Sequence, residues 1–160
     1  MKLLIQFIFL LTLFSHCKKI NPLSAIPAFT GLTVTDNYGM KLSDDPTDWT
    51  FTDKWSTKEA GLFQSSYQTT CSPDASYEIL VYPNPNNGVF TLSVKKPLNA
   101  KLEIRLVDKN FKTLIANDEI VSSTIQLNAS TFGIKGVVRL YYKLVDNNCE
   151  FRGHGDVKIQ

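Results

Sequence analysis

The chain has 160 residues, of which 43% are hydrophobic and 20% are charged. This length and composition predict one domain of ordinary size and exclude a disordered chain. The 17 basic and 15 acidic residues nearly balance, so the charge gives no basis for nucleic acid as a partner.

The N-terminus carries an export signal. A basic start, Met1-Lys2, precedes the apolar run Leu3–Phe14, which has twelve residues. A positive start followed by about 7–15 apolar residues is typical of a secretory signal peptide, whereas a helix that spans a bilayer needs about 20 apolar residues. We therefore predict that residues 1–16 are a signal peptide.

A cysteine follows the apolar run directly. The residues Leu13-Phe14-Ser15-His16-Cys17 resemble the lipobox of bacterial lipoproteins, in which the cysteine is acylated and becomes the first mature residue. The resemblance implies an outer-membrane lipoprotein with lipid attached at Cys17, since more than one acyl chain makes a stable anchor. Ordinary signal cleavage and an uncleaved anchor are the alternatives. Lys18-Lys19 replaces the acidic residues that resemble a surface-export signal in related lipoproteins, which favours the periplasmic face.

The next part of the chain is predicted to be a tether and then a small segment. Residues 17–30 contain two prolines and little periodicity, as expected of a tether. In the segment 31–76, residues 31–35 alternate like a short strand and residues 36–39 are a turn signal. Ser56-Thr57-Lys58-Glu59 is a capping box, which predicts a short helix running to about residue 63. We expect this segment to pack on the domain that follows it.

Both tryptophans, Trp49 and Trp55, lie in this segment, interleaved with acidic residues. Exposed tryptophans favour binding to sugars or to a protein partner, whereas the alternative is that they cover an open end of the following domain. The acidic residues do not have the order of a calcium-binding loop and are interpreted as solvated carboxylates. These residues are Asp44, Asp45, Asp48 and Asp53.

Two further cysteines, Cys71 and Cys149, follow the lipobox cysteine. Export implies an oxidising compartment, in which two cysteines commonly pair, so we favour a disulfide over two separate thiols. Two isolated cysteines and one distant histidine do not have the spacing of a zinc site. We therefore expect neither a metal site nor a cofactor.

From residue 77 onward the chain alternates apolar and polar residues with period two. This pattern predicts antiparallel strands with one face on a core and one in solvent, and it places Arg139, Tyr141 and Lys143 on the solvent face. About seven such strands, separated by turn-forming residues, predict an immunoglobulin-like antiparallel β-sandwich over residues 77–160. The predicted strands are 77–82, 88–95, 101–108, 111–116, 119–128, 137–146 and 149–159.

The residues Val81-Tyr82-Pro83-Asn84-Pro85-Asn86-Asn87-Gly88-Val89-Phe90-Thr91-Leu92 carry a specific resemblance. They look like the opening of the C-terminal sorting domain of the type nine secretion system, a small β-sandwich, and the resemblance extends over residues 78–160. The overall layout resembles small lipoproteins of bacteria that have this secretion system. The prolines also have a physical role, because they cannot donate to a strand ladder and so end the strand.

The sequence does not favour an enzyme. After export His154 is the only histidine, and between two glycines it is expected to be a mobile turn residue. A nucleophile needs a base within hydrogen-bond reach, so no catalytic residue is predicted.

Three functions stay open on the sequence alone. The first is a lipid-anchored, non-catalytic sandwich that serves as a binding subunit of an outer-membrane assembly, with another envelope protein as partner. The second is a secretion substrate whose residues 78–160 are a sorting domain. The third is a carbohydrate-binding module that uses Trp49 and Trp55.

Overall fold

The structure is a computed structural model that describes residues 29, 31–52, 54–63, 69–71, 73–74 and 76–160. The predicted signal peptide and the predicted lipid attachment at Cys17 lie outside the described residues. Within the described part of the chain, no helix combines the length and the apolar character needed to cross a membrane.

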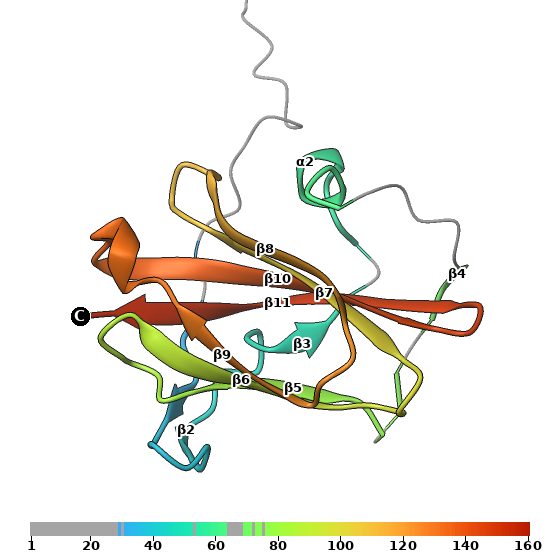
Figure 1. Ribbon diagram of the computed structural model, residues 1–160, viewed down its shortest axis with the longest axis horizontal. Helices are drawn as coiled ribbons and strands as arrows, with labels where there is room; N and C mark the ends of the chain where they lie inside the picture. The colour runs from blue at the N-terminus through green and yellow to red at the C-terminus, as the bar shows by residue number, and fades with distance from the viewer. Residues whose placement is uncertain (1–28, 30, 53, 64–68, 72, 75) are drawn as a thin grey trace, which may run out of the picture.

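Seven strands in the C-terminal half form two antiparallel sheets that pack face to face (Figure 1). The smaller sheet has the order β5-β6-β9, and the sandwich strands of the larger sheet have the order β8-β7-β10-β11, with β8 at one edge. The first, second and fifth strands therefore share one sheet, as in an immunoglobulin constant domain, while the fourth strand lies in the opposite sheet. The strands are β5 Glu78–Tyr82, β6 Val89–Lys95, β7 Lys101–Val107, β8 Thr113–Ile120, β9 Thr124–Asn128, β10 Gly136–Asp146 and β11 Cys149–Ile159. The predicted β-sandwich is confirmed.

One predicted strand boundary is wrong. The sequence suggested a break between the predicted strands 111–116 and 119–128, at Asn117-Asp118, whereas β8 runs through these residues and the turn follows at 121–123. Asn and Asp usually favour turns, but β8 is an edge strand on which polar side chains are tolerated. Arg105 of the neighbouring strand holds Asp118 in an ion pair of 2.7 Å.

The segment before the sandwich adds short elements to it. The hairpin β1 (Val34–Thr35) and β2 (Lys41–Ser43) lies beside β5, and β3 (Thr50–Phe51) extends the larger sheet by pairing with β11. β4 (Thr69–Thr70) pairs with β11 in the parallel direction. The predicted helix is present as α2 (Thr57–Ala60), and both hydrogen bonds of its capping box are formed, but it ends at Ala60 and not near residue 63.

The core lies between the two sheets. Its side chains come from alternate positions of the strands, as period two requires, and most are fully buried. The largest members are Phe90, Leu92, Leu102, Ile104, Leu106, Leu140, Tyr142 and Leu144.

The other face of the larger sheet, its outer face, is also buried. Arg139, Tyr141 and Lys143 on this face are between 1% and 4% exposed, so the prediction that they face solvent is wrong. Trp55 and Phe63 of the N-terminal segment pack against Tyr141, and α2 lies on this side of the sheet (Figure 1). The alternation identified the residues that share a face but not the segment that covers them.

Candidate functional site

The segment 83–88 between β5 and β6 is called the corner. Asn84, between the two prolines of this corner, connects three parts of the chain. Its side chain is fully buried. The amide nitrogen donates to the backbone carbonyls of Thr33 and Asp156, each at 2.9 Å, and the amide oxygen accepts from the backbone N–H of Lys158 at 2.9 Å. The backbone of Asn84 also exchanges two hydrogen bonds with Thr35, of 2.8 and 3.2 Å. The corner therefore fastens both the N-terminal segment and the last strand.

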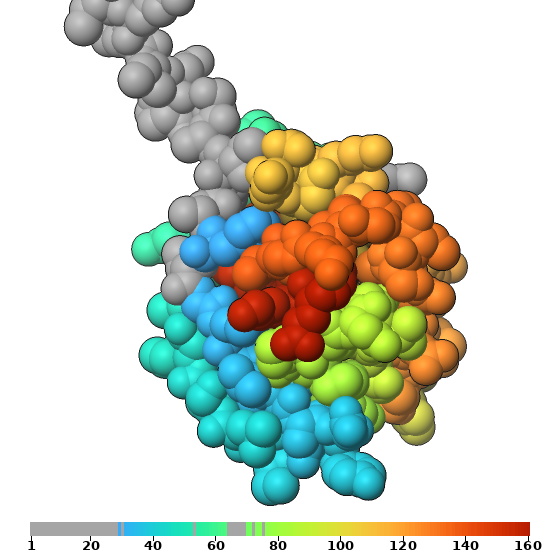
Figure 2. Space-filling model, turned by 90° about the vertical axis from the view of Figure 1, so that its left-hand side faces the viewer, coloured from blue at the N-terminus to red at the C-terminus, as the bar shows by residue number. Residues whose placement is uncertain are grey.

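Asn86 continues this arrangement at the end of the chain. Its backbone N–H donates to the carbonyl of Lys158, and its carbonyl accepts from the N–H of Gln160, both at 2.9 Å. Its side-chain oxygen accepts from the N–H of Gly88 at 2.7 Å. Gly88 has φ +96° and lies against the backbone of Ser130, where a Cβ atom would approach within 2.9 Å, so glycine is required there. In Figure 2 the chain end (dark red) accordingly lies between the blue N-terminal segment and the green corner.

Asp48 also fastens the N-terminal segment to β11. It is 6% exposed, and its two carboxylate oxygens accept from the backbone N–H groups of Asp156, at 2.6 Å, and Thr33, at 2.8 Å. Burial raises the pKa of Asp48 to about 6, although the two N–H donors act to lower it. The expectation of solvated carboxylates is correct for exposed Asp44 but wrong for Asp48, while Asp53 lies outside the described residues.

The outer face of the larger sheet carries a buried ion pair. The guanidinium of Arg139 donates to both carboxylate oxygens of Asp156, with Nε–Oδ1 at 2.7 Å and Nη2–Oδ2 at 2.9 Å. Both side chains are at most 3% exposed. A buried charge is tolerated only when it is paired, so this pair depends on Arg139 and Asp156 being opposite each other in the β10–β11 register.

His154 is a strand residue and not the mobile turn residue that was predicted. It is opposite Tyr141 in the β10–β11 register, with ring centroids 5.8 Å apart. Burial lowers the pKa of His154, and the charge of Arg139 lowers it further. Both effects favour the neutral imidazole. Burial also raises the pKa of the Tyr141 phenol above its ordinary value.

The two glycines that flank His154 make room for aromatic rings on the inner face. A Cβ atom on Gly155 would lie 2.1 Å from the ring of Trp49, and one on Gly153 would lie 2.4 Å from the hydroxyl of Tyr142. Trp49 is 8% exposed and stacks with Tyr142, with ring centroids 6.3 Å apart. Trp49 is thus part of the core at an open side of the sandwich.

Trp55 lies on the opposite, outer face of the same sheet. It stacks on Phe63, with centroids 5.0 Å apart, and meets Tyr141 edge to face. The guanidinium of Arg152 lies 5.4 Å from its ring. Trp49 packs against Tyr142 and Trp55 against the adjacent Tyr141, so the structure does not bring the two tryptophans together as one platform.

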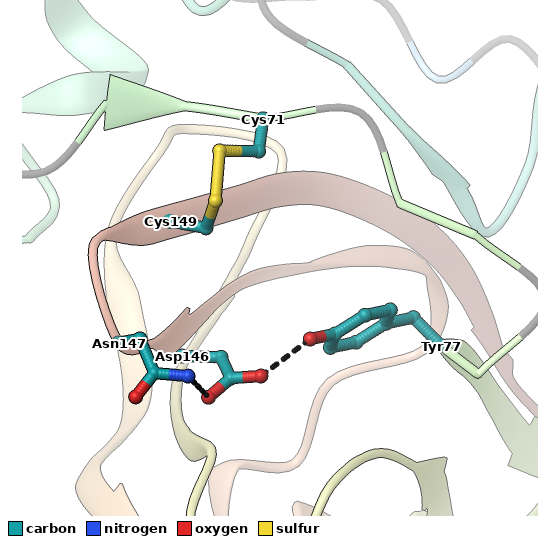
Figure 3. The surroundings of a disulfide bond; sticks show 5 residues. All are labelled: Cys71, Tyr77, Asp146, Asn147 and Cys149. Atoms are coloured by element: carbon teal, nitrogen blue, oxygen red, sulfur yellow. Dashed lines mark hydrogen bonds between the residues drawn. A yellow bond between two sulfur atoms is a disulfide. The ribbon is translucent and has the colours of Figure 1, made fainter.

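The predicted disulfide Cys71–Cys149 is confirmed, with Cα atoms 5.5 Å apart (Figure 3). It joins the loop after β4 to the first residue of β11. Nearby, the hydroxyl of Tyr77 donates to the carboxylate of Asp146 at 2.6 Å. In the described part of the chain, no three His, Cys, Asp or Glu side chains are grouped as metal ligands.

Sequence reasoning missed the residues that fasten the segments, although two signals were present. An asparagine between two prolines has no backbone donor on either side, so its own groups must supply the hydrogen bonds of the corner. Arg139 and Asp156 lie seven residues before Asp146 and seven after Cys149, which are opposite each other next to the hairpin turn. Counting outward from that turn predicts the pair.

The comparisons with known proteins concern the sandwich. Residues 80–137 match the model of the secretion system C-terminal sorting domain. The matched range begins within β5, includes the corner and ends at the start of β10. The resemblance to this domain is confirmed over that range, and it indicates a secreted or envelope-associated protein.

The chain is also similar to a solved structure. The crystal structure of a DUF3244 family protein from Bacteroides vulgatus ATCC 8482, described as an immunoglobulin-like β-sandwich, is 13% identical to this chain. The match covers 70% of this chain and 98% of that protein, with a TM-score of 0.39. No curated protein matches the chain.

Proposed function

We propose that the sandwich is the sorting domain of an exported, non-catalytic binding protein, and that it stays in the mature protein after export by the type nine secretion system. The observation that carries this proposal is the match of residues 80–137 to the secretion system C-terminal sorting domain. The corner in this range also joins the N-terminal segment to the last strand, so recognition of the corner would report that the whole chain has folded.

Three links support retention of the sandwich over its removal as a tail. The disulfide Cys71–Cys149 joins the preceding segment to β11 covalently. Asn84 hydrogen-bonds to Thr33, and β3 pairs with β11. Cleavage of the chain before β5 would leave the two parts connected by the disulfide.

A binding role, in contrast to catalysis, is supported by the chemistry of His154. Its ring is packed against Tyr141 beneath the N-terminal segment, and burial lowers its pKa. A general base must reach substrate, and this imidazole is positioned to pack.

A second candidate rests on the lipobox resemblance at Cys17. In this case the protein is a lipid-anchored accessory subunit of an envelope assembly on the periplasmic face of the outer membrane, with another envelope protein as its partner. Lys18-Lys19 after the cysteine favours this face.

Protease shaving of intact cells distinguishes the two candidates. The full chain with its own N-terminus is expressed in a bacterium that has the secretion system and in a strain that lacks the translocation pore. The first proposal predicts that protease reaches the protein only in the competent strain, with an intact mass that ends at Gln160. Protection in both strains would contradict it and favour the periplasmic subunit.

The corner provides a matched pair of variants for the same experiment. Asn84→Ala removes the buried amide, while Asn87→Ala changes an exposed neighbour in the same corner. We expect Asn84→Ala to stay in the periplasm and Asn87→Ala to behave as the wild type. If a folded Asn84→Ala protein reached the cell surface as well as the wild type, the secretion system would not recognise the corner.

A further inference from the structure

A groove of about 250 Å³ lies on the outer face of the smaller sheet, between the β1–β2 hairpin and strands β5 and β6. In Figure 2 the N-terminal segment (blue to cyan) lies directly against the yellow-green part of the chain that forms these strands. The side chains that line the groove are Tyr38, Glu78, Leu80, Tyr82, Ser93 and Lys95. None of these side chains takes part in the contacts described above that fasten the N-terminal segment to β11.

Tyr38 is an aromatic ring presented to solvent on a fixed turn. Its side chain is 91% exposed. The carboxylate of Asp36 accepts from the backbone N–H groups of Tyr38, at 2.8 Å, and Met40, at 2.9 Å, and the turn is closed by a backbone bond from Asp36 to Met40. A ring held on an ordered backbone binds a ligand without the entropy cost of ordering a loop.

Tyr82 fixes the position of this turn over the sheet. Gly39 has φ +86° and lies against the ring of Tyr82, where a Cβ atom would approach within 3.1 Å. The turn therefore rests on the ring of Tyr82, which sets the separation between the hairpin and the strands. The groove is a preformed feature of the fold.

The sheet supplies both hydrogen-bond donors and hydrogen-bond acceptors to the groove, and the formal charges of Glu78 and Lys95 cancel. Glu78 is opposite Lys95 and Leu80 is opposite Ser93 in the β5–β6 register, so an acceptor, a donor and a hydroxyl surround an apolar floor. The same face continues with uncharged hydroxyl and amide side chains. They are paired as Thr91 with Gln126 and Ser93 with Thr124.

We infer that this groove binds a neutral saccharide, with the apolar face of a sugar ring against Tyr38 and its hydroxyl groups on Glu78, Ser93 and Lys95. A sugar ring has an apolar face and a rim of hydroxyl groups that both donate and accept, which matches a site of aromatic and uncharged or charge-balanced polar groups. The volume suits one sugar unit of a longer chain that continues along the polar face.

An extended peptide is less well matched to the same place. Peptides that add to a sheet need a free strand edge, but Thr35 already takes the edge of β5 at Val81, next to the groove. The Thr35 hydroxyl donates to the carbonyl of Val81 at 2.8 Å, and its backbone bonds with Asn84. The saccharide proposal is independent of the route of export.

Titration calorimetry with the full chain tests the inference. The probes are linear hexasaccharides of glucose, N-acetylglucosamine, mannose and galactose. The variants are Tyr38→Ala and, as a matched control, Phe132→Ala, which removes an aromatic ring that is 44% exposed outside the groove. We expect at least one hexasaccharide to bind, Tyr38→Ala to weaken its affinity by about tenfold or more, and Phe132→Ala to change it by less than about twofold.

The result that overturns the inference is equally direct. If none of the four hexasaccharides binds, or if Tyr38→Ala binds as tightly as the wild type, the groove is not a saccharide site. A peptide library screened against the same protein tests whether the groove binds a peptide instead. A peptide whose binding is lost in Tyr38→Ala, with no hexasaccharide bound, would assign the groove to peptides. Far-ultraviolet circular dichroism of both variants confirms that the fold is kept.

Discussion

The two sheets have outer faces that look alike in the sequence and differ in the structure. On the larger sheet the face carries Arg139, Tyr141 and Lys143, and the N-terminal segment covers it so that these side chains are nearly inaccessible. On the smaller sheet the face carries Thr91 and Ser93, which stay partly exposed, and the β1–β2 hairpin lies along one side of it. The same segment thus closes one face and shapes a groove on the other.

The difference teaches where each kind of function can lie. Polar residues on the covered face are used in pairs, since a charge without a partner is costly in a buried layer. Polar residues on the face of the smaller sheet, such as Thr91 and Ser93, keep partly exposed side chains that a ligand can reach. The following variants test this comparison, starting with the largest expected effect.

Loss of the buried pair tests whether the covered face is closed. Arg139→Ala leaves Asp156 buried without its partner, and we expect the free energy of unfolding to fall by about 4 kcal/mol. Lys101→Ala removes an exposed pair with Glu119 on the same sheet, where both side chains are at least 51% exposed, and is expected to cost less than about 1 kcal/mol. Urea unfolding measures both, and equal losses would show that the face is open to water.

Loss of the disulfide tests how firmly the covering segment is attached. The bond spans 78 positions, and its removal in the double variant Cys71→Ser/Cys149→Ser is expected to lower the free energy of unfolding by about 3 kcal/mol. Thermal unfolding of the oxidised and reduced wild-type protein provides the control. An unchanged midpoint after reduction would contradict the attachment.

The pH dependence of stability tests the fastening by Asp48. Its folded pKa, about 6, lies above the unfolded value of 3.8. The stability that the protonated form contributes is therefore complete below about pH 4 and is lost as the pH rises through 6. Between pH 4 and pH 7 we expect the free energy of unfolding of the wild type to fall by about 2 kcal/mol more than that of Asp48→Asn. Asp44→Asn, a change of an exposed carboxylate, is the control and is expected to follow the wild-type profile.

The smallest effect on stability is expected at the groove of the smaller sheet. Tyr38→Ala removes a side chain that is 91% exposed, so the free energy of unfolding should change by less than about 0.5 kcal/mol. Urea unfolding alongside Arg139→Ala gives the measurement. A loss above about 1.5 kcal/mol would mean that Tyr38 supports the fold and is not presented for binding.

Period-two alternation predicted the sandwich well because it reports a local property, the side of the strand on which each residue lies. The boundaries of β10 and β11 follow from it almost to the residue. It could not predict that Arg139 and Tyr141 are buried, because burial depends on which distant segment packs on that side. The capping box at Ser56 predicted α2 but not the sheet face on which the helix lies.

The residues at the corner show a similar limit. The prolines around Asn84 predicted the end of a strand from their backbone chemistry alone. The hydrogen bonds from Asn84 to Thr33 and Asp156 connect residues 51 and 72 positions apart, and only the packed structure brings them together. The disulfide Cys71–Cys149 was predictable because export and the number of cysteines limited the alternatives.

Nitration of tyrosines by tetranitromethane tests the covered face most directly. Tyr141 and Tyr142 are adjacent in β10 and lie on opposite faces, the outer face and the core, while Tyr38 is exposed. Peptide mass spectrometry of the native protein should show rapid nitration of Tyr38 and protection of both Tyr141 and Tyr142. Nitration of Tyr141 at a rate near that of Tyr38, with Tyr142 still protected, would show that the N-terminal segment does not cover the larger sheet.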